Sequence, residues 1–120
     1  MRFLVVDDSA IDRYLITSLL EELGHQADIY PNPKGVLEKI ATGNYASIFL
    51  DIVMPEQDGY KVLRALRSNP ATAKQYVIFC SSKKTTLEVD YGIKRAGAND
   101  YLVKPATRES IAQVLQKVPV

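Results

Sequence analysis

Short apolar runs alternate with longer amphipathic stretches along the chain. Five of the runs have the length and side-chain bulk of buried strands: Phe3–Val6, Ala27–Tyr30, Ser47–Leu50, Val77–Cys80 and Tyr101–Val103. The stretches between and after them carry apolar residues at helical spacing. Strands and helices in alternation are typical of βα units around a parallel sheet. We therefore expect an α/β fold, a doubly wound sheet of five parallel strands alternating with five helices.

The expected helices have recognisable ends and apolar stripes. The first should begin after Ser9 and end at Gly24, a residue suited to the conformation that caps a helix. Asn32 followed by Pro33 predicts the start of the second, because asparagine caps helices and proline fits their first turn. The fourth should cover roughly residues 86–96. The apolar stripes of the first, second, third and last helices are Ile11, Leu15, Leu19 and Leu23; Val36, Leu37 and Ile40; Val62, Leu63 and Leu66; and Ile111, Val114, Leu115 and Val118.

Charge and composition narrow the possible functions. The 15 Lys and Arg residues balance 14 Asp and Glu residues, which gives a formal net charge of +1. This balance argues against direct nucleic-acid binding, which needs a basic stripe. Cys80 is the only cysteine in the sequence, so no internal disulfide can form and we expect a cytoplasmic setting. The apolar run at the N-terminus is too short for a signal peptide or a membrane span, and 120 residues suit a single domain, residues 1–120.

Polar side chains directly follow four of the predicted strands: Asp7 and Asp8, then Asp51, then Ser81 and Ser82, then Lys104. In doubly wound sheets the binding crevice lies beyond the carboxyl ends of the strands. Three carboxylates in one cleft repel one another unless a cation binds or a proton is retained. Mg²⁺ accepts protein carboxylates, waters and phosphate oxygens, so we expect a Mg²⁺ site here. Its expected ligands are Asp8 and Asp51 directly, the backbone carbonyl of Val53, and Asp7 through a bound water.

The same cleft suits phosphoryl transfer. Asp51 is the natural nucleophile, because carboxylates serve as covalent phosphoryl acceptors. Lys104 supplies a mobile positive charge for one phosphoryl oxygen, and Ser81 supplies a hydroxyl for another. Strand length favours Ser81 over Ser82 for this position. Taken singly, these residues also have plainer interpretations: Asp7 and Asp8 as helix-capping acids, Asp58 as the cap of the third helix, and Lys104 as a surface lysine.

Three motifs in this order make the sequence familiar. The Asp7-Asp8 pair, the loop of residues 51–59 and the segment of residues 101–105 resemble those of bacterial response regulator receiver domains, in particular single-domain members similar to chemotaxis regulators. The resemblance covers essentially the whole chain and implies the strand order 2-1-3-4-5. The implied roles are Asp51 as the phosphorylated aspartate, Asp7 and Asp8 as metal-site acids, Lys104 as the family's lysine, Ser81 as the switch hydroxyl and Tyr101 as the aromatic residue whose rotamer follows phosphorylation. A cis peptide bond between Lys104 and Pro105 is also implied.

The resemblance further implies partners and an output. The phosphoryl group comes from a phosphohistidine on a histidine kinase or phosphotransfer protein, and a downstream target protein binds the face of the fourth helix, fifth strand and fifth helix. On this chain that face covers residues 87–96, 100–103 and 107–117. Phosphorylation should draw Ser81 and Lys104 inward and let Tyr101 turn into the space that Ser81 leaves. A relay intermediate, a phosphate-independent adaptor and the N-terminal piece of a longer regulator stay open as alternatives.

Two other classes of protein share part of this pattern. A phosphatase of the haloacid dehalogenase type also uses a strand-end aspartate, a lysine and Mg²⁺, but it needs an acid where this chain has Val53. A flavodoxin-like protein needs a phosphate-cradling loop after the first strand, where Asp7 and Asp8 would repel a cofactor phosphate. We therefore expect a phosphoacceptor switch rather than an enzyme, with slow self-dephosphorylation because Val53 offers no polar group to a water.

Overall fold

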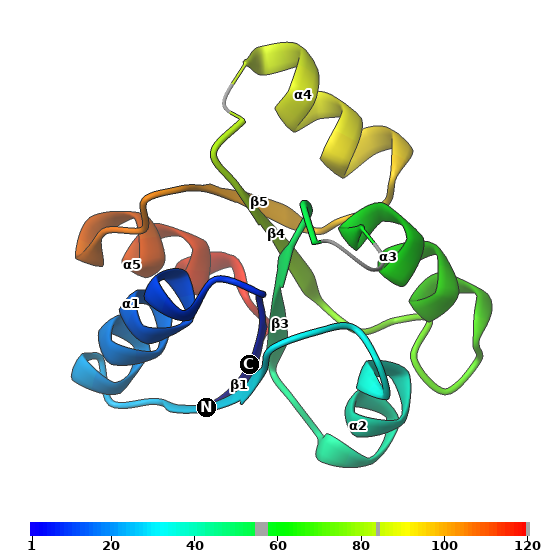
Figure 1. Ribbon diagram of the computed structural model, residues 1–120, viewed down its shortest axis with the longest axis horizontal. Helices are drawn as coiled ribbons and strands as arrows, with labels where there is room; N and C mark the ends of the chain where they lie inside the picture. Colours follow the sequence, from blue (N-terminus) through cyan, green and yellow to red (C-terminus); the bar gives the residue numbers. More distant parts are fainter. Residues whose placement is uncertain (55–57, 84, 120) are drawn as a thin grey trace.

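Five parallel strands form one sheet, in the order β2-β1-β3-β4-β5, in the computed structural model, which describes residues 1–54, 58–83 and 85–119. The strands are β1 (Arg2–Val6), β2 (Gln26–Tyr30), β3 (Ser47–Asp51), β4 (Val77–Ser81) and β5 (Asp100–Val103). The helices are α1 (Ala10–Glu22), α2 (Val36–Gly43), α3 (Gly59–Ser68), α4 (Thr86–Asp90), which continues as the π-helical turn η1 (Tyr91–Arg95), and α5 (Arg108–Lys117). The predicted fold class and strand order are confirmed (Figure 1). Within the described ranges, no helix has both the length and the apolar content needed to cross a membrane.

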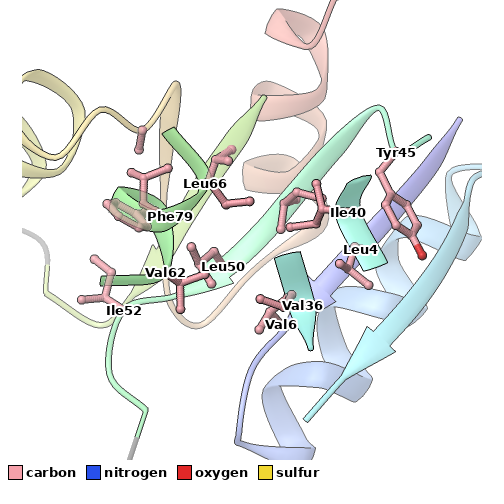
Figure 2. Close-up of a cluster of buried hydrophobic side chains, with 14 of the residues drawn as sticks. Leu4, Val6, Val36, Ile40, Tyr45, Leu50, Ile52, Val62, Leu66 and Phe79 are labelled. Atoms are coloured by element: carbon pink, nitrogen blue, oxygen red, sulfur yellow. The ribbon is translucent and has the colours of Figure 1, made fainter. Parts of the chain in front are cut away.

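Helices cover both faces of the sheet. α1 and α5 lie on one face, and α2, α3 and α4 lie on the other (Figure 1). Because side chains alternate along a strand, Phe3 and Val5 of β1 join the core under α1 and α5, whereas Leu4 and Val6 join the core under α2 and α3. Figure 2 shows this second core. All residues of β3 and β4 are buried, as expected for the inner strands of a parallel sheet covered on both faces.

The buried face of α1 differs from the predicted stripe. Its fully buried residues are Ile16 and Leu20, and Ile11 is 80% exposed, so the assignment of Ile11 to the apolar face was wrong. A stripe at strict four-residue spacing drifts around a helix of 3.6 residues per turn, and its first member has turned away from the sheet. The half-buried members of the stripe are Leu15, Leu19 and Leu23. Gly24 follows the helix with a φ of +87°, as predicted for its end.

The start of α2 also differs from the prediction. The helix begins at Val36 rather than just after Asn32, and Gly35 precedes it with a φ of +77°. The Asn32 side chain accepts a hydrogen bond from the Lys34 backbone N–H (3.0 Å). Asparagine therefore closes a local turn here, which is the competing use of the same side-chain oxygen.

The helical segment predicted over residues 86–96 is present but divided between α4 and η1. Gly92, in η1, lies against two aromatic rings of the sheet. A Cβ atom at this position would be 3.2 Å from the rings of both Phe79 and Tyr101. The absence of a side chain at Gly92 thus allows η1 to approach β4 and β5 closely.

Candidate functional site

The carboxyl ends of the strands meet at one edge of the sheet and border a cleft of about 420 Å³. Its lining consists of Asp8, Ser9, Asp12, Asp51, Val53, Ser81, Ser82, Lys104 and Pro105. The structure thus brings together side chains that are far apart in the sequence: Asp8 and Lys104 are separated by 96 positions. Residues 55–57, which belong to the loop motif, lie outside the described residues.

Three acids stand close enough to share one cation. One oxygen each from Asp7, Asp8 and Asp51 lies within 4.8 Å of the others. Asp7 and Asp51 are buried, with 1% and 4% of their surface exposed, whereas Asp8 is exposed. Backbone donors hold the two buried carboxylates: Ser9 N–H donates to Asp7 Oδ1 (2.9 Å), and Val53 N–H donates to Asp51 Oδ1 (3.4 Å). Such a set of hard oxygen atoms matches the ligand preference of Mg²⁺.

Lys104 lies among the carboxylates directly after β5. Its ammonium nitrogen is 2.8 Å from Asp7 Oδ2, 3.0 Å from Asp12 Oδ2 and 3.2 Å from Asp51 Oδ1. Burial lowers the pKa of Lys104, but hydrogen bonds to Asp7 and Asp12 and the charges of Asp7 and Asp51 outweigh it, so the pKa is raised. The side chain is therefore a permanent cation in the cleft. The peptide bond from Lys104 to Pro105 is cis, as the resemblance implied.

The environment of Asp51 opposes its ionisation. Burial is the largest cause and the charge of Asp7 is the next, and together they outweigh the attraction of Lys104. The pKa of Asp51 is raised from 3.8 to about 7. In the absence of a metal ion, the cleft thus holds a carboxylate whose charge is incompletely compensated, which is the condition that a bound divalent cation relieves.

Replacing Asp51 with Asn should stabilise the metal-free protein. A raised pKa means that the ionised carboxyl costs folding free energy in full above about pH 7, and this cost shrinks as the pH falls from about 7 to 4. In EDTA at pH 8, Asp51→Asn should raise the free energy of unfolding in urea by about 1–3 kcal/mol, and by clearly less at pH 5. Asp58→Asn is the control, because asparagine preserves a helix cap and the free energy should change by less than about 0.5 kcal/mol. A variant no more stable than the parent at pH 8 would contradict this reading.

Ser81 and Tyr101 both contact the backbone of Lys83. Ser81 is buried at the end of β4, and its Oγ accepts a hydrogen bond from Lys83 N–H (3.2 Å). The Tyr101 hydroxyl donates to the Lys83 carbonyl oxygen (2.8 Å), and the ring is buried, with 8% of the residue's surface exposed. A displacement of Ser81 therefore acts on the same short segment that anchors the Tyr101 hydroxyl. Ser82, the other serine of the pair, is exposed.

Three further residues complete the description of the site. Val53 lines the cleft and is 61% exposed, so it presents an apolar side chain at the cleft's margin. Asp58 Oδ1 accepts a hydrogen bond from Lys61 N–H (3.0 Å) and caps α3, which confirms its interpretation as a helix cap.

Asp12 also lines the cleft but was not singled out from the sequence. The signal for Asp12 was weak, because an acid in the first turn of a helix ordinarily serves the helix itself.

Known proteins resemble this chain in sequence and in fold. The family model of the response regulator receiver domain matches residues 3–116. Protein PilH of Pseudomonas aeruginosa is 32% identical to this chain, and the match covers 98% of this chain and 96% of PilH. The gliding motility regulatory protein of Myxococcus xanthus is 34% identical, and the match covers 98% of this chain but only 15% of that protein. Chemotaxis response regulator CheY4 of Vibrio cholerae has the same fold, with a TM-score of 0.87 at 24% identity over 98% of both chains.

A second solved structure with the same fold contains a metal ion. The receiver domain of sensor histidine kinase PA1611 from Pseudomonas aeruginosa has a magnesium ion coordinated in its active-site cleft. It matches with a TM-score of 0.83 at 25% identity, over 98% of this chain and 95% of that one. With the family model matched over nearly the whole sequence and the fold and strand order in agreement, this chain belongs to the family of response regulator receiver domains.

Proposed function

We propose that this protein is a phosphoacceptor switch of a two-component system, in which Asp51 receives a phosphoryl group from a phosphohistidine on a histidine kinase or phosphotransfer protein. The observation that carries the proposal is the position of Asp51. Its carboxylate is buried at the end of the central strand, within reach of two further acids and of the Lys104 ammonium, in a cleft open to a donor. Carboxylates act as covalent phosphoryl acceptors when neighbouring cations offset the charge that develops in transfer.

The acidic cluster fits a Mg²⁺ ion. Asp8 and Asp51 would bind it directly, together with the Val53 carbonyl, and Asp7 would hold one of its waters. The support from this chain is the clustering of three carboxylate oxygens and the raised pKa of Asp51, both of which a divalent cation would offset. When bound, the metal would supply positive charge to the oxygens of the transferred group.

The chain's own residues would carry the transfer as follows. One Asp51 oxygen forms a bond to phosphorus while the bond from phosphorus to the histidine nitrogen breaks, and the electron pair of that bond stays on the imidazole. Lys104 would pair with one phosphoryl oxygen, and the Ser81 hydroxyl would donate to another. Both side chains already lie at the cleft, so the rearrangement that they require is local.

The movement of Lys104 and Ser81 toward the phosphoryl group would also change the surface that a target protein binds. The phosphoryl group adds a charge of about −1.5 to −2, which draws Lys104 and Ser81 toward it. Ser81 and Tyr101 both hydrogen-bond to the Lys83 backbone. A movement of Ser81 would therefore displace Lys83 and change the orientation of the Tyr101 ring. The affected face, α4-β5-α5, is where we propose that the target protein binds.

Intact-mass measurement tests the proposal. The protein is incubated with acetyl phosphate in Mg²⁺ or in EDTA, and Asp51→Asn is the matched variant because it preserves the size of the side chain. We expect the wild type to gain the mass of one phosphoryl group in Mg²⁺ only, and Asp51→Asn to gain nothing. An equal gain in the variant, or no gain in the wild type with either acetyl phosphate or a phosphorylated histidine donor, would refute the assignment.

Val53 should influence how long the phosphoryl group persists. Its exposed apolar side chain at the cleft gives no hydrogen bond to an attacking water. Val53→Asn would supply such a group, and we expect phosphoryl loss to become about 3–10-fold faster, since positioning one reactant has effects of at least this size. The measurement is the decay of the phosphorylated fraction after the donor is removed. A rate that is unchanged or lower would contradict the role of this position.

A further inference from the structure

Asp12 provides a third carboxylate for Lys104. An ammonium group has three N–H donors, and in the described part of the chain the three carboxylate oxygens of Asp7, Asp12 and Asp51 lie 2.8, 3.0 and 3.2 Å from Nζ. Asp12 comes from the first turn of α1 rather than from a strand end, and it lines the cleft. Unlike the other two acids, it is absent from the cluster of carboxylates that could hold a metal ion.

A purely helical role does not account for the Asp12 side chain. In a capping box, the acid at this position would accept a hydrogen bond from the N–H of the cap residue, here Ser9. That N–H already donates to Asp7 Oδ1 (2.9 Å). The cap itself uses the Asp12 backbone, whose N–H donates to Ser9 Oγ (3.3 Å) and does not depend on the side chain. The Asp12 carboxylate is therefore directed at Lys104, with 27% of its surface exposed.

We propose that Asp12 is a positioning residue that holds Lys104 in the unphosphorylated arrangement and restrains phosphorylation of Asp51 by small anionic donors. This inference rests on the proposed function. Lys104 Nζ donates hydrogen bonds to Asp12 and Asp51, so pairing with an incoming phosphoryl oxygen competes with these contacts. Of these two partners, Asp12 is the one that neither accepts the phosphoryl group nor belongs to the metal cluster. Its negative charge also repels the donor.

The reaction that shows the effect is phosphorylation by acetyl phosphate. An Asp51 oxygen forms a bond to phosphorus, the bond from phosphorus to the acetyl oxygen breaks, and acetate leaves with the electron pair. Removing the Asp12 charge weakens the hold of this side chain on Lys104 and lowers the negative charge that acetyl phosphate meets. Asp12→Asn should therefore lower the KM for acetyl phosphate and raise the second-order rate by about 3–10-fold, the size expected for one partly screened charge at this range.

The variants are designed to separate charge from fold. Asp12→Glu retains the charge and should stay within about twofold of the wild type. Glu38→Gln is the control, because Glu38 is also an acid in the first turn of a helix, α2, and it does not line the cleft. Each variant is measured at Mg²⁺ concentrations that saturate it. A structural role alone would change the melting temperature without changing the KM or its salt dependence, and Asp12→Asn should show a weaker dependence of the rate on salt.

A second measurement does not depend on phosphorylation. Urea unfolding of Asp12→Asn, Lys104→Met and the double variant in EDTA forms a double-mutant cycle, and the effects should be non-additive because the two side chains form an ion pair. Additive effects would show that Asp12 and Lys104 do not interact, and this result would overturn the inference. Coupling together with equal phosphorylation rates in wild type and Asp12→Asn would overturn the restraint alone. No phosphoryl uptake by the wild type would overturn the proposed function and the restraint with it.

Discussion

Replacing Lys104 with Met should destabilise the metal-free protein by about 2–4 kcal/mol at neutral pH, the largest single effect that we expect at this site. The variant preserves the length of the side chain but removes the positive charge. Asp7, with 1% of its surface exposed, would then be a buried carboxylate without its cation, 2.8 Å from where the ammonium stood. Asp12 and Asp51 would lose the same partner. Urea unfolding in EDTA gives the free-energy difference directly.

The conditions of this experiment provide two internal checks. Saturating Mg²⁺ should recover much of the loss, because a ligand that binds only the folded state stabilises it and the variant's cleft is more negative. Lys83→Met is the matched control, since Lys83 is an exposed lysine 4.0 Å from Glu88, and its loss should cost less than about 0.5 kcal/mol. A Lys104→Met protein as stable as the wild type in EDTA would show that the acids do not depend on this cation.

Replacing Gly59 with Ala should destabilise the protein by about 2–4 kcal/mol and also slow phosphorylation. Gly59 begins α3, and its N–H donates to the Ile52 carbonyl oxygen (2.7 Å). A Cβ atom here would lie 2.4 Å from the Asp51 carbonyl oxygen and 2.8 Å from Ile52 Cα. Both obstacles are backbone atoms, so the clash cannot be relieved by a side-chain rotation. The end of β3, which carries the acceptor, would have to move.

Gly24→Ala separates this steric effect from backbone strain. Gly24 has a φ of +87°, but a Cβ atom would meet nothing within 4 Å. Its replacement should cost about 1 kcal/mol and leave the phosphorylation rate unchanged, because the strained turn is at the far end of α1. Equal effects of the two alanine variants on phosphorylation would indicate that the close contact at Gly59 does not position Asp51.

The sheet could be predicted well because its signal is local and repeated. Each buried strand appears as an apolar run, and β1, β3, β4 and β5 each lead directly to a polar residue at the cleft. The parallel arrangement then brings these strand ends together whatever their separation in sequence. For this reason the placement of Asp51 and Lys104 in one cleft required no knowledge of the loops.

The errors also have physical reasons. Ile11 follows a four-residue spacing, but such a stripe drifts around a helix of 3.6 residues per turn, and Ile11 is 80% exposed. Asn32 can cap a helix or close a turn with the same oxygen, and here it closes a turn with Lys34 N–H. Asp12 contacts Lys104 across 92 positions of sequence, and only the folded cleft, where the first turn of α1 meets the residue after β5, shows which way that carboxylate points.

The most direct test of the central claim is to identify the residue that carries the phosphoryl group. The protein is treated with acetyl phosphate and Mg²⁺ and then reduced with sodium borohydride, which converts an acyl phosphate of aspartate to homoserine, and the modified position is read by peptide mass spectrometry. We predict homoserine at position 51 and at no other aspartate, and none when EDTA replaces Mg²⁺. Homoserine at Asp7 or Asp8, or a phosphorylated protein with an unmodified Asp51, would contradict the account.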